Sequence, residues 1–593
     1  MAEITVRPFN RSLAAERGES LRTVLARSGL EIDYPCGGKG TCRQCRLSVE
    51  PAPSSGRGRL PEEELARGVR LACQTVVEGD CTVTIPEERI GRRSWRLATR
   101  EEDVRVSVAP TLARLAVRLR EPSLDDQRPD WERLAAELGR RGVRSPLPDP
   151  AALEQLSLDL RSGGWAVDAI LDDGEFIGAA GPGRVCGLAV DLGTTTVDLA
   201  LADLESGALL GRTALLNRQV SFGADVVSRA QAFHADREPV RLAALQTIEE
   251  GAWMLLEAAG VDPVQVVKTV VVGNPIMTHI LNGIDPFQLT LVPYLPVTAS
   301  SIRSRARDLG WTFQARGSVE TLPLVSAYVG ADTVAMMISL DLASEGGTSL
   351  AIDIGTNGEM VLARRGELIT TSTAAGPAFE GAQIACGMRA LEGAITGIAI
   401  GADGALASAT VGGAPPRGIC GTGLVSAVAA LLDHGVIDAT GRFAEPADIG
   451  GVLGSRLFQQ QGEVAFALSD DRRIFISQGD VRRLQLAKGA VRTGIDTLLA
   501  ATGVSREGLE AVRLAGNFGA GLDARAAMRI GLIPELDPAK VLVVGNAALR
   551  GAILALLSRA HARAGEAAAR AARFVELGGR PEFQARFAEA MMF

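Results

Sequence analysis

Four cysteines near the start of the chain have spacing typical of metal ligands. Cys36, Cys42 and Cys45 lie within ten residues, and 27 residues separate the third of them from Cys73. In a reducing cytosol such a cluster indicates a metal centre before it indicates disulfides. Structural zinc commonly uses two CxxC pairs, whereas only one is present here. We therefore predict a [2Fe–2S] cluster held by these four thiolates, with a four-cysteine zinc site as the alternative.

The residues around these cysteines follow the element order of a small ferredoxin. Apolar residues alternate in "ITVRPF", which predicts a strand, and Leu21, Val24 and Leu25 share one face of a following helix. The five-residue gap between the first two cysteines resembles vertebrate and bacterial [2Fe–2S] ferredoxins, because plant-type domains have four residues there. This resemblance implies a β-grasp domain over residues 1–88. The other cysteines are predicted to be core thiols: Cys81, Cys186, Cys386 and Cys420.

Two segments about 160 residues apart repeat one pattern. "LAVDLGTTTVDLALAD" begins at Leu188 and "LAIDIGTNGEMVLAR" at Leu350, and each indicates an apolar strand, a tight turn and a second strand. Glycine lets such a turn approach phosphate oxygens, which accept hydrogen bonds from the turn N–H groups and threonine hydroxyls. We predict two facing phosphate hairpins in which Asp191 and Asp353 are catalytic and hold Mg²⁺, directly or through water. The phosphate contacts are assigned to Gly193, Thr194, Thr195, Thr196, Gly355, Thr356 and Asn357.

This pair of hairpins resembles the acetate and sugar kinase, heat-shock and actin superfamily. Further pieces follow in the order that the resemblance implies: connecting segments at 270–280 and 541–552, and a nucleoside-binding strand and turn at 512–523. Neither a Walker A pattern nor a dinucleotide-binding glycine motif is present. The resemblance implies a two-lobed, RNase H-like (actin-like) domain that binds ATP between its lobes. The nucleoside contacts are assigned to Gly516, Asn517 and Gly519.

The 593 residues are too many for one ordinary domain, and 47% of them are hydrophobic, which indicates well-buried cores. We predict an α/β multidomain protein with a charged linker at 89–103, a small α/β middle domain at 104–182 and the ATPase domain at 183–593. The net charge of −8 excludes nucleic acid as the default partner. No run approaches the roughly 20 apolar residues of a membrane span, so we expect a cytoplasmic protein without membrane contact.

A ferredoxin domain ahead of this ATPase type resembles the reductive activators of corrinoid proteins. Phrases along nearly the whole chain carry the resemblance, among them "NRQVSFGADVVSRAQ", "GNPIMTHILNGIDP" and "AAGPAFEGAQIACGMRA". The resemblance implies that the protein returns one electron from its cluster to the Co(II) corrinoid of a methyl-carrier protein, restoring Co(I), with ATP driving the step. An upstream reductase would then supply electrons to the cluster.

Two further features have open interpretations. The segment 372–388, which carries Glu380, either reaches the corrinoid or is a buried Gly/Ala turn that packs the nucleotide domain. His279 is favoured as a satisfied helix residue over a metal ligand.

Three other functions fit parts of the sequence. An activator of a radical dehydratase is disfavoured because such activators lack a separate ferredoxin domain. A small-molecule kinase with a fused redox sensor would yield a phosphorylated product. A ferredoxin scaffold with a vestigial cleft is disfavoured because both hairpins are intact. A homodimer is compatible with the C-terminal helices, but nothing in the sequence favours one.

Overall fold

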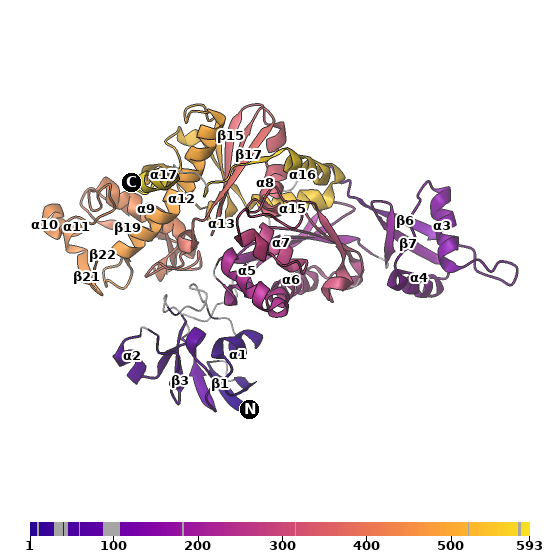
Figure 1. Cartoon of the computed structure of the whole chain (residues 1–593), viewed down its shortest axis with the longest axis horizontal. Helices are drawn as coiled ribbons and strands as arrows, with labels where there is room; N and C mark the ends of the chain where they lie inside the picture. The colour runs from indigo at the N-terminus through magenta and orange to yellow at the C-terminus, as the bar shows by residue number, and fades with distance from the viewer. Residues whose placement is uncertain are drawn as a thin grey trace.

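The structure is a computed structural model, and the fold of the chain is described from it. The residues that it describes are 1–8, 11–28, 32, 40, 45–58, 60–86, 107–180, 183–223, 225–314, 316–519, 521–578 and 583–593. A small N-terminal unit and a small middle unit lie on different sides of a larger two-lobed body (Figure 1). The whole predicted linker 89–103 lies outside the described residues, as do the predicted ligands Cys36 and Cys42.

The N-terminal unit is a five-stranded mixed sheet in the order β2-β1-β5-β3-β4. The buried side chains of β1 alternate, so Ile4 and Val6 point into the core, where Leu21 and Val24 of the helix pack on them. Helix α1 is on the side of this unit that faces the two-lobed body (Figure 1) and contacts η3 (Arg218–Ser221) there. The elements are β1 (Ala2–Arg7), β2 (Arg11–Ala15), α1 (Leu21–Arg27), β3 (Arg46–Glu50), α2 (Glu62–Ala66), β4 (Val69–Leu71), η1 (Ala72–Gln74) and β5 (Cys81–Thr84).

The middle unit is an antiparallel three-stranded sheet in the order β6-β7-β8, covered by two helices. Four leucines at helical spacing, two on each helix, are buried against the sheet, which is why these helices pack as amphipathic elements. The elements are β6 (Leu112–Arg118), α3 (Asp130–Arg140), α4 (Pro150–Ser162), β7 (Ala166–Asp172) and β8 (Glu175–Ala180).

The first lobe of the body is built on a six-stranded sheet in the order β11-β10-β9-β12-β14-β13. Its central strands β9 and β12 are almost wholly buried, as parallel strands covered on both faces must be. The elements are β9 (Cys186–Leu192), β10 (Thr196–Asp203), β11 (Leu209–Leu216), α5 (Val226–Ala235), α6 (Arg237–Ala259), β12 (Val266–Gly273), α7 (Pro275–Leu281), β13 (Ile302–Arg305) and β14 (Ser318–Thr321).

The second lobe repeats this arrangement in the order β25-β24-β15-β16-β17-β26. In both lobes the strand before the predicted phosphate turn pairs with its hairpin partner on one side and with a parallel strand on the other. The two related halves expected from the repeated segments are therefore present. The strands are β15 (Thr348–Ile354), β16 (Gly358–Arg364), β17 (Glu367–Thr373), β24 (Ala511–Ala515), β25 (Val541–Gly545) and β26 (Arg573–Phe574).

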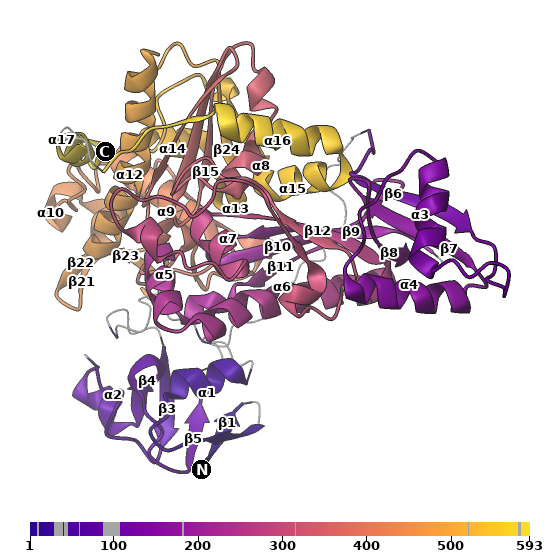
Figure 2. The same cartoon turned by 45° about the vertical axis from the view of Figure 1, so that its right-hand side comes forward.

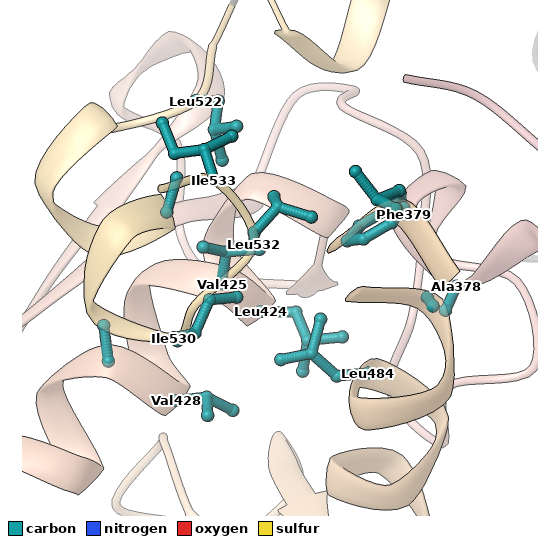
Figure 3. Close-up of a cluster of buried hydrophobic side chains, with 14 of the residues drawn as sticks. Ala378, Phe379, Leu424, Val425, Val428, Leu484, Leu522, Ile530, Leu532 and Ile533 are labelled. Atoms are coloured by element: carbon teal, nitrogen blue, oxygen red, sulfur yellow. The ribbon is translucent and has the colours of Figure 1, made fainter. Parts of the chain in front are cut away.

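A further group of helices and two small sheets complete the second lobe. Figure 3 shows part of their core, where Leu424 and Val428 of α9 lie near Leu484 of α12, with Phe379 at the edge of the cluster. The elements are η8 (Pro377–Glu380), β18 (Ala394–Ile400), β19 (Leu406–Thr410), β20 (Gly418–Ile419), α9 (Gly421–Asp433), α10 (Pro446–Ile449), α11 (Gly451–Ser455), β21 (Leu457–Gln460), β22 (Glu463–Ala467), β23 (Phe475–Ser477), α12 (Gln478–Thr502), α13 (Gly516–Gly519), α14 (Ala524–Arg529), α16 (Arg559–Ala571) and α17 (Phe583–Ala590).

Two helices, α8 (Ala331–Ser339) and α15 (Ala547–Leu557), lie between the sheets of the lobes (Figure 2). They cross closely at Gly551, where a Cβ atom would lie 1.9 Å from the carbonyl oxygen of Ala335. This crossing therefore requires glycine. Because α8 and α15 pack against both sheets, they form the shared spine of the two lobes.

The predicted fold class is confirmed: a β-grasp unit, a small α/β unit and a two-lobed actin-like domain. No helix among the described residues is both long enough and apolar enough to cross a membrane.

Candidate functional site

A cavity of about 370 Å³ lies between the two lobes, within the usual size range for small-molecule sites. The turns of both predicted phosphate hairpins line it. From the first hairpin come Asp191, Gly193, Thr194, Thr195 and Thr196, and from the second come Asp353, Gly355, Thr356 and Asn357.

The two turns face each other across the cavity at their threonines. The hydroxyl oxygens of Thr195 and Thr356 are 3.5 Å apart, although the residues belong to different lobes. The side chain of Asn217 donates to the carbonyl of Gly193 at 2.8 Å, which fixes the first turn. At Gly193 a Cβ atom would lie 2.6 Å from the carbonyl oxygen of Thr196, so only glycine allows this tight turn. The arrangement presents hydroxyl donors from both lobes to one point.

Five carboxyl groups gather at the same end of the cavity: Asp191, Asp198, Asp332, Asp353 and Glu359. Burial, followed by the nearby charge of Asp332, raises the pKa of Asp353 to about 7. Burial also raises the pKa of Asp332 to about 6, and burial together with Asp198 and Asp332 holds the pKa of Asp191 well above its usual value.

Crowded carboxylates of this kind attract a cation. Among the described residues, no three histidine, cysteine or carboxylate side chains converge closely enough to hold a metal ion directly. A divalent cation here would therefore share its coordination with water and phosphate, as Mg²⁺ prefers.

An aromatic pair also borders the cavity. The rings of Phe379 and Phe518 are 4.7 Å apart between centroids, and both residues line the cavity. Gly516 lies beside them with φ near +83°, and a Cβ atom there would lie 2.3 Å from a carboxylate oxygen of Asp353. Of the predicted nucleoside residues, Gly516 lines the cavity and Gly519 does not, while the backbone of Asn517 lies in α13.

Two asparagines that the sequence did not single out line the cavity beside the hairpin turns. Asn274 caps α7 and donates to the hydroxyl of Thr194 at 3.2 Å. Asn546 caps α15 and donates to the carboxylate of Asp191 at 3.0 Å. Both stand in the tetrapeptide "VVGN" at the end of a parallel strand, and this repeat is the pattern that would have predicted them. Asp198, Asp332 and Glu359 were also missed. Asp198 and Glu359 stand in the second strands of the two hairpins, but the repeat does not align them with each other, and Asp332 lies in α8 outside the repeat.

The segment 372–388 contributes directly to the cavity. Glu380 ends η8, and its carboxylate accepts hydrogen bonds from the hydroxyls of Thr195 and Thr356, each at 2.6 Å. Of the two interpretations, the structure favours a turn that packs the nucleotide domain. His279 is buried in α7, with its Nδ1 at 2.6 Å from the carbonyl oxygen of Pro275. Its Nε2 has no hydrogen-bond partner among the described residues, so the expected satisfied histidine is satisfied at one ring nitrogen only.

Two of the four predicted cluster ligands lie in the described residues, and the fold brings them together. The sulfur atoms of Cys45 and Cys73 are 3.3 Å apart, although 28 positions separate the residues. They are not joined by a disulfide, and Cys45 is buried. Two thiols held side by side suit one metal ion of a cluster. Cys81 begins β5, where burial and then Asp80 raise its pKa, so its thiol is kept protonated.

A solved structure titled a reductive activator for corrinoid, iron–sulfur protein matches all of this chain and 98% of its own, with 33% identity and a TM-score of 0.73. The chain belongs to the family of reductive activators of corrinoid proteins. Four family models agree with this assignment along the chain. They are a 2Fe-2S iron–sulfur cluster binding domain (4–78), the RACo linker region (101–187), the RACo middle region (186–345) and the C-terminal ASKHA domain of RACo (347–593).

Two curated relatives carry related descriptions. The corrinoid activation enzyme RamQ of Eubacterium limosum is 29% identical and covers 96% of this chain and 95% of its own. A [Co(II) methylated amine-specific corrinoid protein] reductase of Methanosarcina barkeri is 28% identical over 61% of this chain and 68% of its own. The family resemblance expected from the sequence is thus confirmed.

The ferredoxin match supports a [2Fe–2S] cluster and contains all four predicted ligands, while Cys81 lies beyond it. The ASKHA match supports ATP binding.

Proposed function

We propose that this protein is an ATP-dependent reductive activator that transfers one electron from its [2Fe–2S] cluster to the Co(II) corrinoid of a methyl-carrier protein, restoring Co(I). The observation that carries the proposal is the presence, in one chain, of a converging cysteine pair and a cleft with two facing phosphate hairpins. The cluster supplies one-electron redox capacity, and the cleft supplies a nucleotide-dependent change of shape.

The residues of the cleft have separate parts in this function. Asp191 and Asp353 would hold Mg²⁺ through water, next to Asp332, whose charge adds to the negative field. The hydroxyls of Thr195 and Thr356, together with the turn N–H groups, would hold phosphate oxygens from the two lobes. Because ligands bound between two lobes favour their closure, ATP and its hydrolysis products would stabilise different arrangements.

ATP is needed because the electron transfer runs uphill. Each 100 mV of unfavourable potential costs about 2.3 kcal/mol for one electron. If one nucleotide state of the activator binds the Co(II) partner more tightly than the Co(I) partner, that difference in binding offsets the cost. An upstream reductase would then return an electron to the cluster.

The test combines the purified protein, a reductant, ATP and a candidate Co(II) corrinoid protein, and follows the Co(I) absorption spectrum. We expect Co(I) only when ATP is present. Asp191→Ala should abolish ATP turnover and Co(I) formation while the visible absorption of the cluster stays intact. Co(I) formation at the same rate without ATP, or unchanged ATP turnover in the variant, would remove the assignment. A phosphorylated small molecule as the product would instead support a kinase.

A further inference from the structure

The carboxylate of Glu380 joins the two lobes at the centre of the cleft. One oxygen accepts from the Thr195 hydroxyl of the first lobe, and the other accepts from the Thr356 hydroxyl of the second, both at 2.6 Å. These hydroxyls are the donors assigned above to phosphate oxygens. The carboxylate therefore marks the place in the cleft where both hairpins converge on one anionic group.

A bound terminal phosphate and this carboxylate cannot share the two hydroxyls, because both are anions that need them as donors. When the hydroxyls bind phosphate, Glu380 loses two hydrogen bonds and faces a like charge. A water molecule in the cleft can then donate one proton to the carboxylate and direct its oxygen lone pair toward phosphorus.

The backbone around Glu380 is packed too tightly to carry the carboxylate far away. The carbonyl oxygen of Phe379 lies against Gly421, where a Cβ atom would be only 1.8 Å from it. The N–H of Ala385 donates to the buried carboxylate of Asp480 at 2.9 Å, which pins the segment to the start of α12. Only the side chain is thus free to turn, and it stays within reach of a water next to the hairpins.

A buried arginine interacts electrostatically with the same carboxylate. Arg229 of α5 is fully buried, and its Nε donates to the carbonyl oxygen of Gly223 at 2.9 Å. Its Nη2 has no hydrogen-bond partner in the part of the chain that the structure describes. The carboxylates whose charges act on it are Glu380 and then Asp225. A buried positive charge therefore lies close enough to Glu380 to interact with its carboxylate.

We propose that Glu380 positions the water that attacks the terminal phosphate of ATP and accepts its proton. The water oxygen bonds to the terminal phosphorus, and the bond from that phosphorus to the bridging oxygen breaks. The proton passes to Glu380 and is later released to solvent or phosphate. ATP and water become ADP and phosphate, with no change in oxidation state. This inference rests on the proposed ATP-dependent function and assigns its hydrolytic step.

The experiment compares the full-length protein with Glu380→Gln and Glu380→Asp. Two quantities are measured: kcat for phosphate release, and the Kd of a non-hydrolysable ATP analogue by calorimetry. Glutamine keeps the shape but cannot take a proton, so kcat should fall at least about 100-fold. Binding of the analogue should be equal or tighter, because a neutral group competes less for the hydroxyls. Aspartate should restore part of kcat.

Glu445→Gln is the matched control, because Glu445 is an exposed glutamate of the same lobe that makes no capping bond at α10. It should leave both quantities unchanged. Unchanged kcat in Glu380→Gln overturns the proposal. So does a lower rate at limiting ATP that disappears at saturating ATP, because that is a change in KM alone. The proposed activator function can fail separately from the role of Glu380. If the wild type hydrolyses ATP but forms no Co(I), the activator function is contradicted and the assignment of Glu380 to ATP hydrolysis still stands.

Discussion

Burial of Asp353 beside other carboxyl groups has a cost in stability that depends on pH. Its pKa rises from 3.8 to about 7, mainly because folding buries the carboxyl group away from water and secondly because the charge of Asp332 is close to it. The folded state therefore binds a proton more tightly than the unfolded state. Proton binding at Asp353 stabilises the folded state fully when the pH is below the pKa of this group in the unfolded chain. This stabilisation is lost as the pH rises from about 4 to about 7. The difference corresponds to roughly 4 kcal/mol at most.

Asp353→Asn should remove this pH dependence. The amide does not titrate, so the variant should gain melting temperature relative to the wild type as the pH rises from 5 to 8. The measurement is thermal unfolding of both proteins across this range, without nucleotide and with a chelator present. Asp448→Asn, at an exposed position in α10, is the control and should follow the wild type. Parallel curves for the wild type and Asp353→Asn would contradict the assignment of this raised pKa.

The cysteine pair permits a second prediction about single residues. Cys45→Ser and Cys73→Ser should each lose the cluster, because the fold places these sulfurs 3.3 Å apart as neighbouring ligands. Cys81→Ser should keep it, since that thiol begins β5 outside the ferredoxin match. Iron and acid-labile sulfide per chain are the measurements, with about two of each expected for the wild type and for Cys81→Ser. Zinc in place of iron would contradict the cluster assignment.

The sequence predicted best the secondary-structure elements whose residue pattern lies within one short segment of the chain. The two hairpins repeat a strand, a Gly-Thr turn and a strand, so alternation and turn chemistry were enough to place Asp191 and Asp353. Contacts between distant segments carried no such pattern. Glu380 meets Thr195 across 185 positions of sequence, and Gly551 of α15 meets Ala335 of α8 across more than 200. The packing of the lobes decides such contacts, and no periodicity encodes it.

The middle unit offers a prediction about how elements are joined. Asp172 ends β7 and is almost fully buried, and it accepts hydrogen bonds from Lys268 of β12 at 3.0 Å and from Ser318 of β14 at 2.6 Å. Lys268 also lies 3.2 Å from Glu320. This buried charge cluster ties the middle sheet to the sheet of the first lobe.

Lys268→Met should destabilise this junction by about 3–5 kcal/mol, because two buried carboxylates lose their shared cation. The measurement is hydrogen exchange of β6–β8 together with the melting temperature. Lys268→Met combined with Asp172→Asn should recover part of the loss. Arg67→Met is the control, because it breaks only an exposed pair with Glu63 and should change the stability by less than about 1 kcal/mol. Unaltered exchange in β6–β8 would show that the cluster does not hold the unit in place.

At the scale of the whole molecule, the spine of α8 and α15 divides the body into parts that can move and parts that cannot. The cleft separates the lobes on one side of this spine, and the turns that line it come from both lobes. The middle unit is fixed to the first lobe by the buried cluster around Asp172 and by ion pairs such as Arg316 with Asp159. Nucleotide binding should therefore change the cleft and leave the middle unit unaltered.

Hydrogen exchange of the full-length protein with and without a non-hydrolysable ATP analogue tests this division. We expect protection of the two hairpin turns and of 377–388, because the analogue bridges the lobes and replaces water in the cleft. Exchange in β6–β8 should not change, since no group there lines the cavity. Asp353→Asn, which removes one of the two carboxyl groups proposed to hold Mg²⁺, should show less protection at the same analogue concentration. Protection that spreads into β6–β8 would contradict the division, because it would mean that the middle unit moves with the nucleotide rather than with the first lobe.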